Sequence, residues 1–119
     1  MKKDSVQGLD ILEYDGVGFD KTVVFDGWRV CFLNQGEKFT KDTVKYLERH
    51  LCTDEVFVLL KGKATLIIGK ELDEVELSEC KIYNVKKNIW HAIYLEKDAK
   101  VLVIENSDTT KENSEYYYF

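Results

Sequence analysis

Four side chains that can bind a metal ion or transfer protons lie near the ends of apolar segments of this chain. Glu48 and His50 are separated by one residue, Glu55 follows closely, and His91 lies in a later apolar segment. The chain has no histidine besides these two. Imidazole and carboxylate groups together suit zinc, iron, manganese and nickel, and both also act as general acids and bases. The four residues therefore indicate a site for a divalent metal or a small polar ligand.

Two expected strands position the first three of these residues. If 43–51 is a strand, its side chains alternate between two faces, and one face carries Val44, Tyr46, Glu48 and His50. After a short turn, a second strand at 55–60 begins with Glu55 and carries Phe57 on the same face. Two acids and a histidine can then meet at one mouth of a mostly apolar interior.

A third expected strand, 89–95, brings the second histidine. Its alternation places His91 on the same face as Ile93 and Leu95, among apolar neighbours rather than in a polar loop. A single histidine on a strand is more often a hydrogen-bonded core residue than a ligand. Two acids and a second histidine nearby favour a functional site more than a single histidine would. Three side chains are expected to contact a bound ligand: Tyr46, Phe57 and Ile93.

The hydrophobic pattern has a period of two almost everywhere, which favours strands over helices. Asp-Gly pairs and other glycine- or asparagine-containing turns separate the apolar runs, and no window predicts a long amphipathic helix. Many short strands at regular spacing are typical of an all-β sandwich or barrel. The expected strands are 9–14, 22–25, 28–33, 43–51, 55–60, 64–68, a weak edge strand within 71–79, 80–85, 89–95 and 100–105.

Length, charge and cysteine content narrow the class of protein. A chain of 119 residues is expected to form a single domain. The net charge of -5 and the scattered lysines argue against a nucleic-acid partner. No segment has the length and apolarity of a membrane span or a signal peptide, which predicts a cytoplasmic protein without a membrane partner. The three cysteines have no Cys-X-X-Cys spacing, so free thiols are expected.

The last segment, 106–119, begins polar and ends in four consecutive aromatic residues. Aromatic side chains gain free energy when they leave water, because each can bury about 150 Å² or more. The segment is therefore expected to dock, either on the barrel itself or on a second subunit.

Two stretches of the sequence resemble the motifs of the cupin superfamily. The first cupin motif is G(X)5HXH(X)3-4E(X)6G, and its second half matches the stretch that runs from Glu55 to Gly62. With the four-residue gap, the two histidine positions of this motif fall on Glu48 and His50. The resemblance covers about half of the chain and implies a small single-domain cupin, with a double-stranded β-helix or jelly-roll barrel.

The second cupin motif, G(X)5PXG(X)2H(X)3N, matches the chain only at its histidine, His91. The glycine, proline, glycine and asparagine positions of this motif are occupied by Cys80, Lys86, Asn88 and Leu95. The resemblance implies a metal set of Glu48, His50, Glu55 and His91, although three histidines and one glutamate are more usual in the family. It also implies a homodimer. A shifted register would bring Cys52 to the site, but its spacing to Glu55 is too short for the motif.

These observations leave three functions open. The first is a metal-dependent lyase, isomerase or dioxygenase that acts on a small polar metabolite, with Glu48, His50 and His91 as catalytic residues. The second is a metal-free module that binds a sugar or an organic acid between Tyr46, Phe57 and Trp90, with or without acid–base catalysis. The third is a degenerate barrel without catalysis, in which the buried acids and histidines only satisfy one another.

Overall fold

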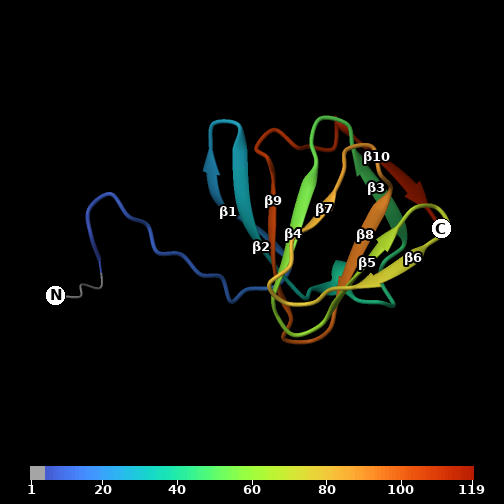
Figure 1. Cartoon of the computed structure of the whole chain (residues 1–119), viewed down its shortest axis with the longest axis horizontal. Coiled ribbons are helices and arrows are strands. Elements are labelled where there is room, and N and C mark those ends of the chain that lie inside the picture. Colours follow the sequence, from blue (N-terminus) through green and yellow to red (C-terminus); the bar gives the residue numbers. More distant parts are fainter. Residues whose placement is uncertain (1–4) are drawn as a thin grey trace.

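The computed structural model describes residues 5–119, and this part of the chain forms two five-stranded antiparallel sheets (Figure 1). The first sheet has the order β1-β2-β9-β4-β7 and the second the order β10-β3-β8-β5-β6. The all-β prediction is confirmed. The first sheet contains β1 (Phe19–Phe25), β2 (Trp28–Asn34), β9 (Lys100–Asn106), β4 (Glu55–Lys61) and β7 (Tyr83–Val85); the second contains β10 (Ser114–Tyr118), β3 (Tyr46–His50), β8 (His91–Leu95), β5 (Ala64–Ile68) and β6 (Asp73–Glu76).

The hydrophobic core lies between the two sheets and is built by alternation along the strands. In β2, β8 and β9, and in β4 as far as Leu59, every second side chain is buried, as expected for strands with one face toward a core. The largest side chains that are almost fully buried within the cluster are Leu33, Phe57, Leu95, Val101 and Val103. This packed layer fills one end of the space between the sheets and leaves the other end to polar groups.

Gly62, in the turn between β4 and β5, is required by the close approach of two chain segments. Its φ of 81° lies in the left-handed region, and a Cβ at this position would lie 2.7 Å from the Cα of Ala99. Any larger residue would push the β4–β5 turn away from the segment that leads into β9. This glycine therefore allows the β4–β5 turn to lie against the segment that leads into β9.

Most expected strands are present, with ends that differ by a few residues, but one expectation is wrong. The segment 9–14 is not a strand: it extends away from the barrel (Figure 1), and Leu9, Ile11 and Leu12 are exposed. Its apolar residues have no neighbouring strand to pair with, so a short apolar run was not sufficient. The polar connection after β2 contains a 3-10 helix, η1 (Glu37–Phe39), and β3 begins only at Tyr46.

The C-terminal aromatic segment forms β10, which lies along β3 at the edge of the second sheet. Ser114 is opposite His50 in this pairing, and Tyr118 is opposite Tyr46. The pairing carries the last strand past the residues of the candidate site. Within residues 5–119, no helix has the length and apolarity needed to cross a bilayer.

Candidate metal centre and its cavity

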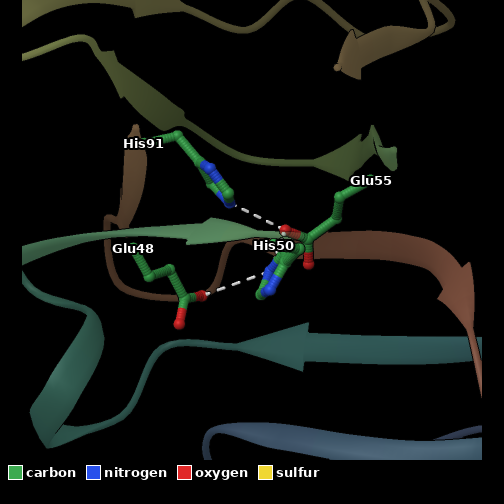
Figure 2. A group of neighbouring side chains, drawn as sticks. All are labelled: Glu48, His50, Glu55 and His91. Atoms are coloured by element: carbon green, nitrogen blue, oxygen red, sulfur yellow. Dashed lines mark hydrogen bonds and ion pairs between the residues drawn. The ribbon is translucent and has the colours of Figure 1, made fainter. Parts of the chain in front are cut away.

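Three strands bring the four predicted ligands together (Figure 2). Glu48 and His50 come from β3, Glu55 is the first residue of β4, and His91 is the first residue of β8. Glu48 and His91 are direct partners in the pairing of β3 with β8. One ligand atom from each of the four residues lies within 4.8 Å of the others. Cys52 is exposed and is not part of this group.

Glu55 is the centre of the group. Its Oε1 atom lies 3.0 Å from Nε2 of His50 and 2.8 Å from Nε2 of His91. Glu55, His50 and His91 are all buried, whereas the side chain of Glu48 is 34% exposed. Oε1 of Glu48 lies 3.7 Å from Nε2 of His50. Three members are therefore held inside the protein, and Glu48 is the one that a ligand can reach most easily.

The remaining ring nitrogens are held by groups outside the centre. Nδ1 of His91 donates a hydrogen bond to the carbonyl oxygen of Ile89 at 2.9 Å, and Nδ1 of His50 lies 2.8 Å from the hydroxyl of Ser114. A carbonyl oxygen can only accept, so Nδ1 of His91 carries a proton. Both histidines thus turn Nε2 toward Glu55. This second layer of hydrogen bonds is typical of histidines that bind metals.

The mutual contacts shift the pKa values of the buried groups. Burial alone raises the pKa of Glu55, but hydrogen bonds from the two histidines outweigh it and hold the pKa below the usual range. Burial alone lowers the pKa values of His50 and His91, and the Glu55 carboxylate outweighs it, so that both are raised. Burial, reinforced by the charge of Glu55, raises the pKa of Glu48.

A buried ion pair that the sequence analysis missed borders the centre. Arg29 of β2 and Glu105 of β9 are direct partners in the pairing of these strands, and Nε of Arg29 donates to Oε2 of Glu105 at 3.0 Å. The other oxygen, Oε1, lies 3.9 Å from Nε2 of His50 and is the one buried side-chain polar atom of the described residues without a hydrogen-bond partner. Burial, followed by the charge of Glu55, raises the pKa of Glu105 to about 7.

The signal for this pair was present in the strand pattern. Arg29 shares one face of β2 with the buried residues Cys31 and Leu33. Glu105 shares one face of β9 with the buried residues Val101 and Val103. Each strand therefore places a charged residue at an inward position. Two inward charges of opposite sign on neighbouring strands predict a buried pair, because an isolated buried charge is strongly unfavourable.

The centre lies at the base of a cavity of about 920 Å³, a volume in the range of small-molecule sites. The three predicted ligand-contacting residues, Tyr46, Phe57 and Ile93, all line it. Trp90 does not line it, so the expectation that this ring forms a wall is wrong. The Trp90 ring instead lies under the guanidinium of Arg49, 4.4 Å from its centroid, on the other face of the sheet.

The donor set of the centre fits a divalent metal ion. Two imidazoles and two carboxylates are suitable ligands, and donors that share an ion at about 2.1 Å lie at most about 4.2 Å apart, close to the observed separations. The charges fit as well: with neutral histidines, three carboxylates and one guanidinium leave two negative charges in the centre and its border. A divalent ion would neutralise them.

Comparison with known proteins identifies the fold through structure alone. No family model matches the sequence, and no curated protein matches it. A variant of the Streptomyces nucleoside dehydratase Pac13, solved with uridine, has a TM-score of 0.65 and 11% identity, covering 89% of this chain and 83% of that chain. A cupin-2 domain protein from Shewanella frigidimarina has a TM-score of 0.60 and 14% identity, covering 78% of this chain and 84% of that chain.

A third similar structure is a 3,4-ketoisomerase from Helicobacter canadensis, with a TM-score of 0.59 and 16% identity, covering 73% of this chain and 66% of that chain. These proteins share the arrangement of strands with this chain, while their sequences are far apart from it. The expected jelly-roll topology and the resemblance of the two motif stretches agree with this likeness. The chain therefore has the cupin fold.

Proposed function

We propose that this protein is a divalent-metal-dependent enzyme that acts on a small polar metabolite. The observation that carries the proposal is the convergence of the ligand atoms of Glu48, His50, Glu55 and His91 at the base of the cavity. The hydrogen bonds of His91 to Ile89 and of His50 to Ser114 support it, because they leave Nε2 of each ring for the centre.

The residues of the chain have distinct tasks in this proposal. When bound, a divalent ion supplies a Lewis acid that polarises a substrate oxygen or activates water. Glu55, His50 and His91 hold the ion in a buried position, and Glu48, the most exposed of the four, can also exchange a proton with the substrate. Phe57 and Ile93 form an apolar wall that excludes water from one side.

The similar structures support an enzyme rather than a binding module. One of them is a nucleoside dehydratase and another a 3,4-ketoisomerase, so this fold carries lyase and isomerase chemistry in those proteins. We favour lyase or isomerase chemistry for this chain, with dioxygenase chemistry as the third choice. Because function depends on the site and not on the fold, the assignment must be tested on the centre itself.

The test is elemental analysis of the purified protein, followed by titration of metal-free protein with zinc, iron, manganese and nickel. We expect about one ion per chain, at least a hundredfold weaker binding in His91→Ala, and unchanged binding in the control Glu96→Gln, an exposed acid outside the cavity. Equal metal binding by the wild type and His91→Ala would refute the metal centre.

One observation favours a second candidate, a metal-free site that binds a sugar or organic acid and catalyses by acid and base. Both Nε2 atoms already have a partner in Glu55, so the buried group is satisfied without an ion when the ring of His91 is protonated on both nitrogens. Thermal unfolding separates the candidates. A rise in the unfolding temperature with one metal supports the first, and a rise with a metabolite in the presence of EDTA supports the second.

A homodimer in the cytoplasm is part of the proposal. Apolar side chains stand exposed on the N-terminal segment and on the β1–β2 hairpin, where Ile11, Phe25 and Trp28 are 70%, 61% and 47% exposed. Such residues favour association with a second copy. The free state of Cys31, Cys52 and Cys80 suits a reducing compartment. Light scattering of the wild type and of a Phe25→Ser/Trp28→Ser variant tests the dimer: two chains are expected for the first and one for the second.

A further inference from the structure

The mouth of the cavity carries an excess of positive charge that the centre does not explain. Four lysines line it and one exposed acid, Glu37, lines it with them. The lysines are exposed, and none of them takes part in an ion pair among the described residues. They come from β1, η1, the segment before β3 and the segment before β10: Lys21, Lys38, Lys45 and Lys111.

The positive charge at the mouth is opposite in sign to the net charge of the chain. The sequence has 22 acidic and 17 basic residues, so a random sample of its surface would be acidic. The other acids that line the cavity are Glu48, Glu55 and Glu105 of the centre and its border, and these are balanced by Arg29 and the histidines, or by a divalent ion. The charge that faces an entering ligand is therefore positive.

A group of tyrosines forms part of the same wall. The rings of Tyr46 and Tyr116 are 5.4 Å apart, and those of Tyr46 and Tyr118 are 5.2 Å apart. Tyr116 and Tyr118 alternate along β10, which places both on the cavity side beside Tyr46 of β3. Each of these tyrosine residues is at least 36% exposed. Half-exposed aromatic faces of this kind stack against sugar rings and planar heterocycles.

The geometry points to a small anionic metabolite as the ligand of the cavity, with a ring that stacks on Tyr46, Tyr116 and Tyr118 and a carboxylate or phosphate group that the four lysines attract. This inference rests on the proposed function only where the bound metabolite is taken to be the substrate of a metal-dependent enzyme. The attraction between the lysines and the anionic group does not require a metal ion. Lysine is suited to the role because its ammonium is a mobile point charge that follows an anion of either geometry. Charges around a cleft also speed the entry of an oppositely charged ligand.

Matched ligand pairs test the charge requirement: glucose with glucuronate for the carboxylate, and glucose with glucose 6-phosphate and uridine with uridine monophosphate for the phosphate. Binding is measured by calorimetry with metal-free and with metal-loaded protein. Two variants lose the same charge, K21Q/K38Q/K45Q/K111Q at the mouth and K61Q/K63Q/K81Q/K97Q on exposed positions that do not line this cavity.

We expect the anionic member of at least one pair to bind at least about tenfold more tightly than its neutral partner, in the wild type and in the control variant. The mouth variant should lose this preference, at about twofold per lysine, and added salt should reduce it in the wild type. Equal binding within every pair, a preference that survives in the mouth variant, or no anion binding at millimolar concentration would each overturn the inference.

The ring requirement is tested with Tyr116→Ala and Tyr118→Ala. Both should weaken the binding of the preferred ring-bearing anion by about fivefold, while Tyr116→Phe, which keeps the ring, should not. Unchanged binding in both alanine variants would overturn this part. Failure of the metal proposal has a different signature, because His91→Ala would then leave metal binding unchanged while the mouth variant still lost the anion preference.

Discussion

Nε2 of His91 lies 2.8 Å from Oε1 of Glu55, and the two side chains are 3% and 7% exposed. The same carboxylate oxygen accepts from His50, so one atom joins two strands of the second sheet to the first residue of β4 in the other sheet. Glu55 therefore holds the two sheets together, and in the proposed metal centre it would also provide a ligand atom.

Glu55→Gln should lower both stability and metal affinity. The amide removes the charge that faces two histidines, and loss of one partner of a buried charged pair costs about 3 kcal/mol. Glu48→Gln makes the same chemical change at a position that is 34% exposed and should lower the free energy of unfolding by less than about 1 kcal/mol. Urea unfolding of metal-free protein measures both. Similar losses in the two variants would contradict the central position of Glu55.

Arg29→Met should destabilise the protein by about 3 kcal/mol, because it leaves the carboxylate of Glu105 buried without a partner. The double variant Arg29→Met/Glu105→Leu should recover most of this loss, because two apolar side chains can replace a buried pair. A double-mutant cycle from urea unfolding measures the coupling. Additive losses in the double variant would show that the two residues do not act as a pair.

The stability of metal-free protein should fall as the pH rises from about 5 through neutrality. The folded-state pKa values of His50 and His91 are raised above 6.5, so their contribution is complete below that pH and is lost as the pH rises through the folded value. The pKa of Glu105, raised from 4.5 to about 7, adds a loss of the same sign between those two values. Each group contributes a slope of up to about 1.4 kcal/mol per pH unit.

Unfolding in urea, after treatment with a chelator, measures this pH dependence. His50→Gln/His91→Gln should show a flatter curve, with the remaining slope confined to the Glu105 window. Protein saturated with zinc should show the opposite trend below pH 7, because protons compete with the ion for Nε2. A metal-free wild type that becomes more stable from pH 6 to pH 8 would contradict the histidine assignments.

Cys80→Gly should stabilise the protein by about 0.5–1 kcal/mol. Cys80 has a φ of 65°, a left-handed conformation that is unfavourable for most side chains but not for glycine. Asn88→Gly should change the stability little, although Asn88 has a φ of 71°, because asparagine tolerates this region. Cys80→Ala controls for loss of the thiol and should not stabilise. Thermal and urea unfolding of the three variants give the comparison.

Cys80 and Asn88 also show that the second cupin motif can match this chain in backbone conformation where the residue types differ. Cys80 and Asn88 occupy the two glycine positions of the second cupin motif, and both have a positive φ. The backbone of the motif is thus kept while its glycines are not. A search for residue identity cannot detect this, because the left-handed conformation is a property of the turn and becomes visible only in the structure.

The four residues of the candidate site could be predicted from the sequence, whereas the residues that border it could not. Alternation in 43–51, 55–60 and 89–95 placed Glu48, His50, Glu55 and His91 on inward faces, because the period of a strand is regular over a few residues. It could not show which distant strands are neighbours, so the pairing of Arg29 with Glu105 was missed. The hydrogen bond of Ser114 to His50 was missed for the same reason, since it depends on β10 lying beside β3.

The N-terminal run 9–14 failed for a different reason. Its apolar residues resemble those of a strand, but a strand needs a partner for its backbone hydrogen bonds, and none lies beside this segment. The local sequence pattern indicates that a segment can form a strand. Whether it does so depends on a neighbouring strand that can pair with its backbone. The dimer proposed above would be one way to supply the missing partner.

The contacts of the centre join residues that are far apart along the chain. The pair of Glu55 and His91 spans 36 residues, that of His50 and Ser114 spans 64, and that of Arg29 and Glu105 spans 76. Folds dominated by such distant contacts form slowly, because the intervening chain must be ordered first. During synthesis, His50 therefore leaves the ribosome long before its partner does. In the proposed metal centre, an ion would therefore reach its full set of four ligands only after β8 has brought His91 beside β3.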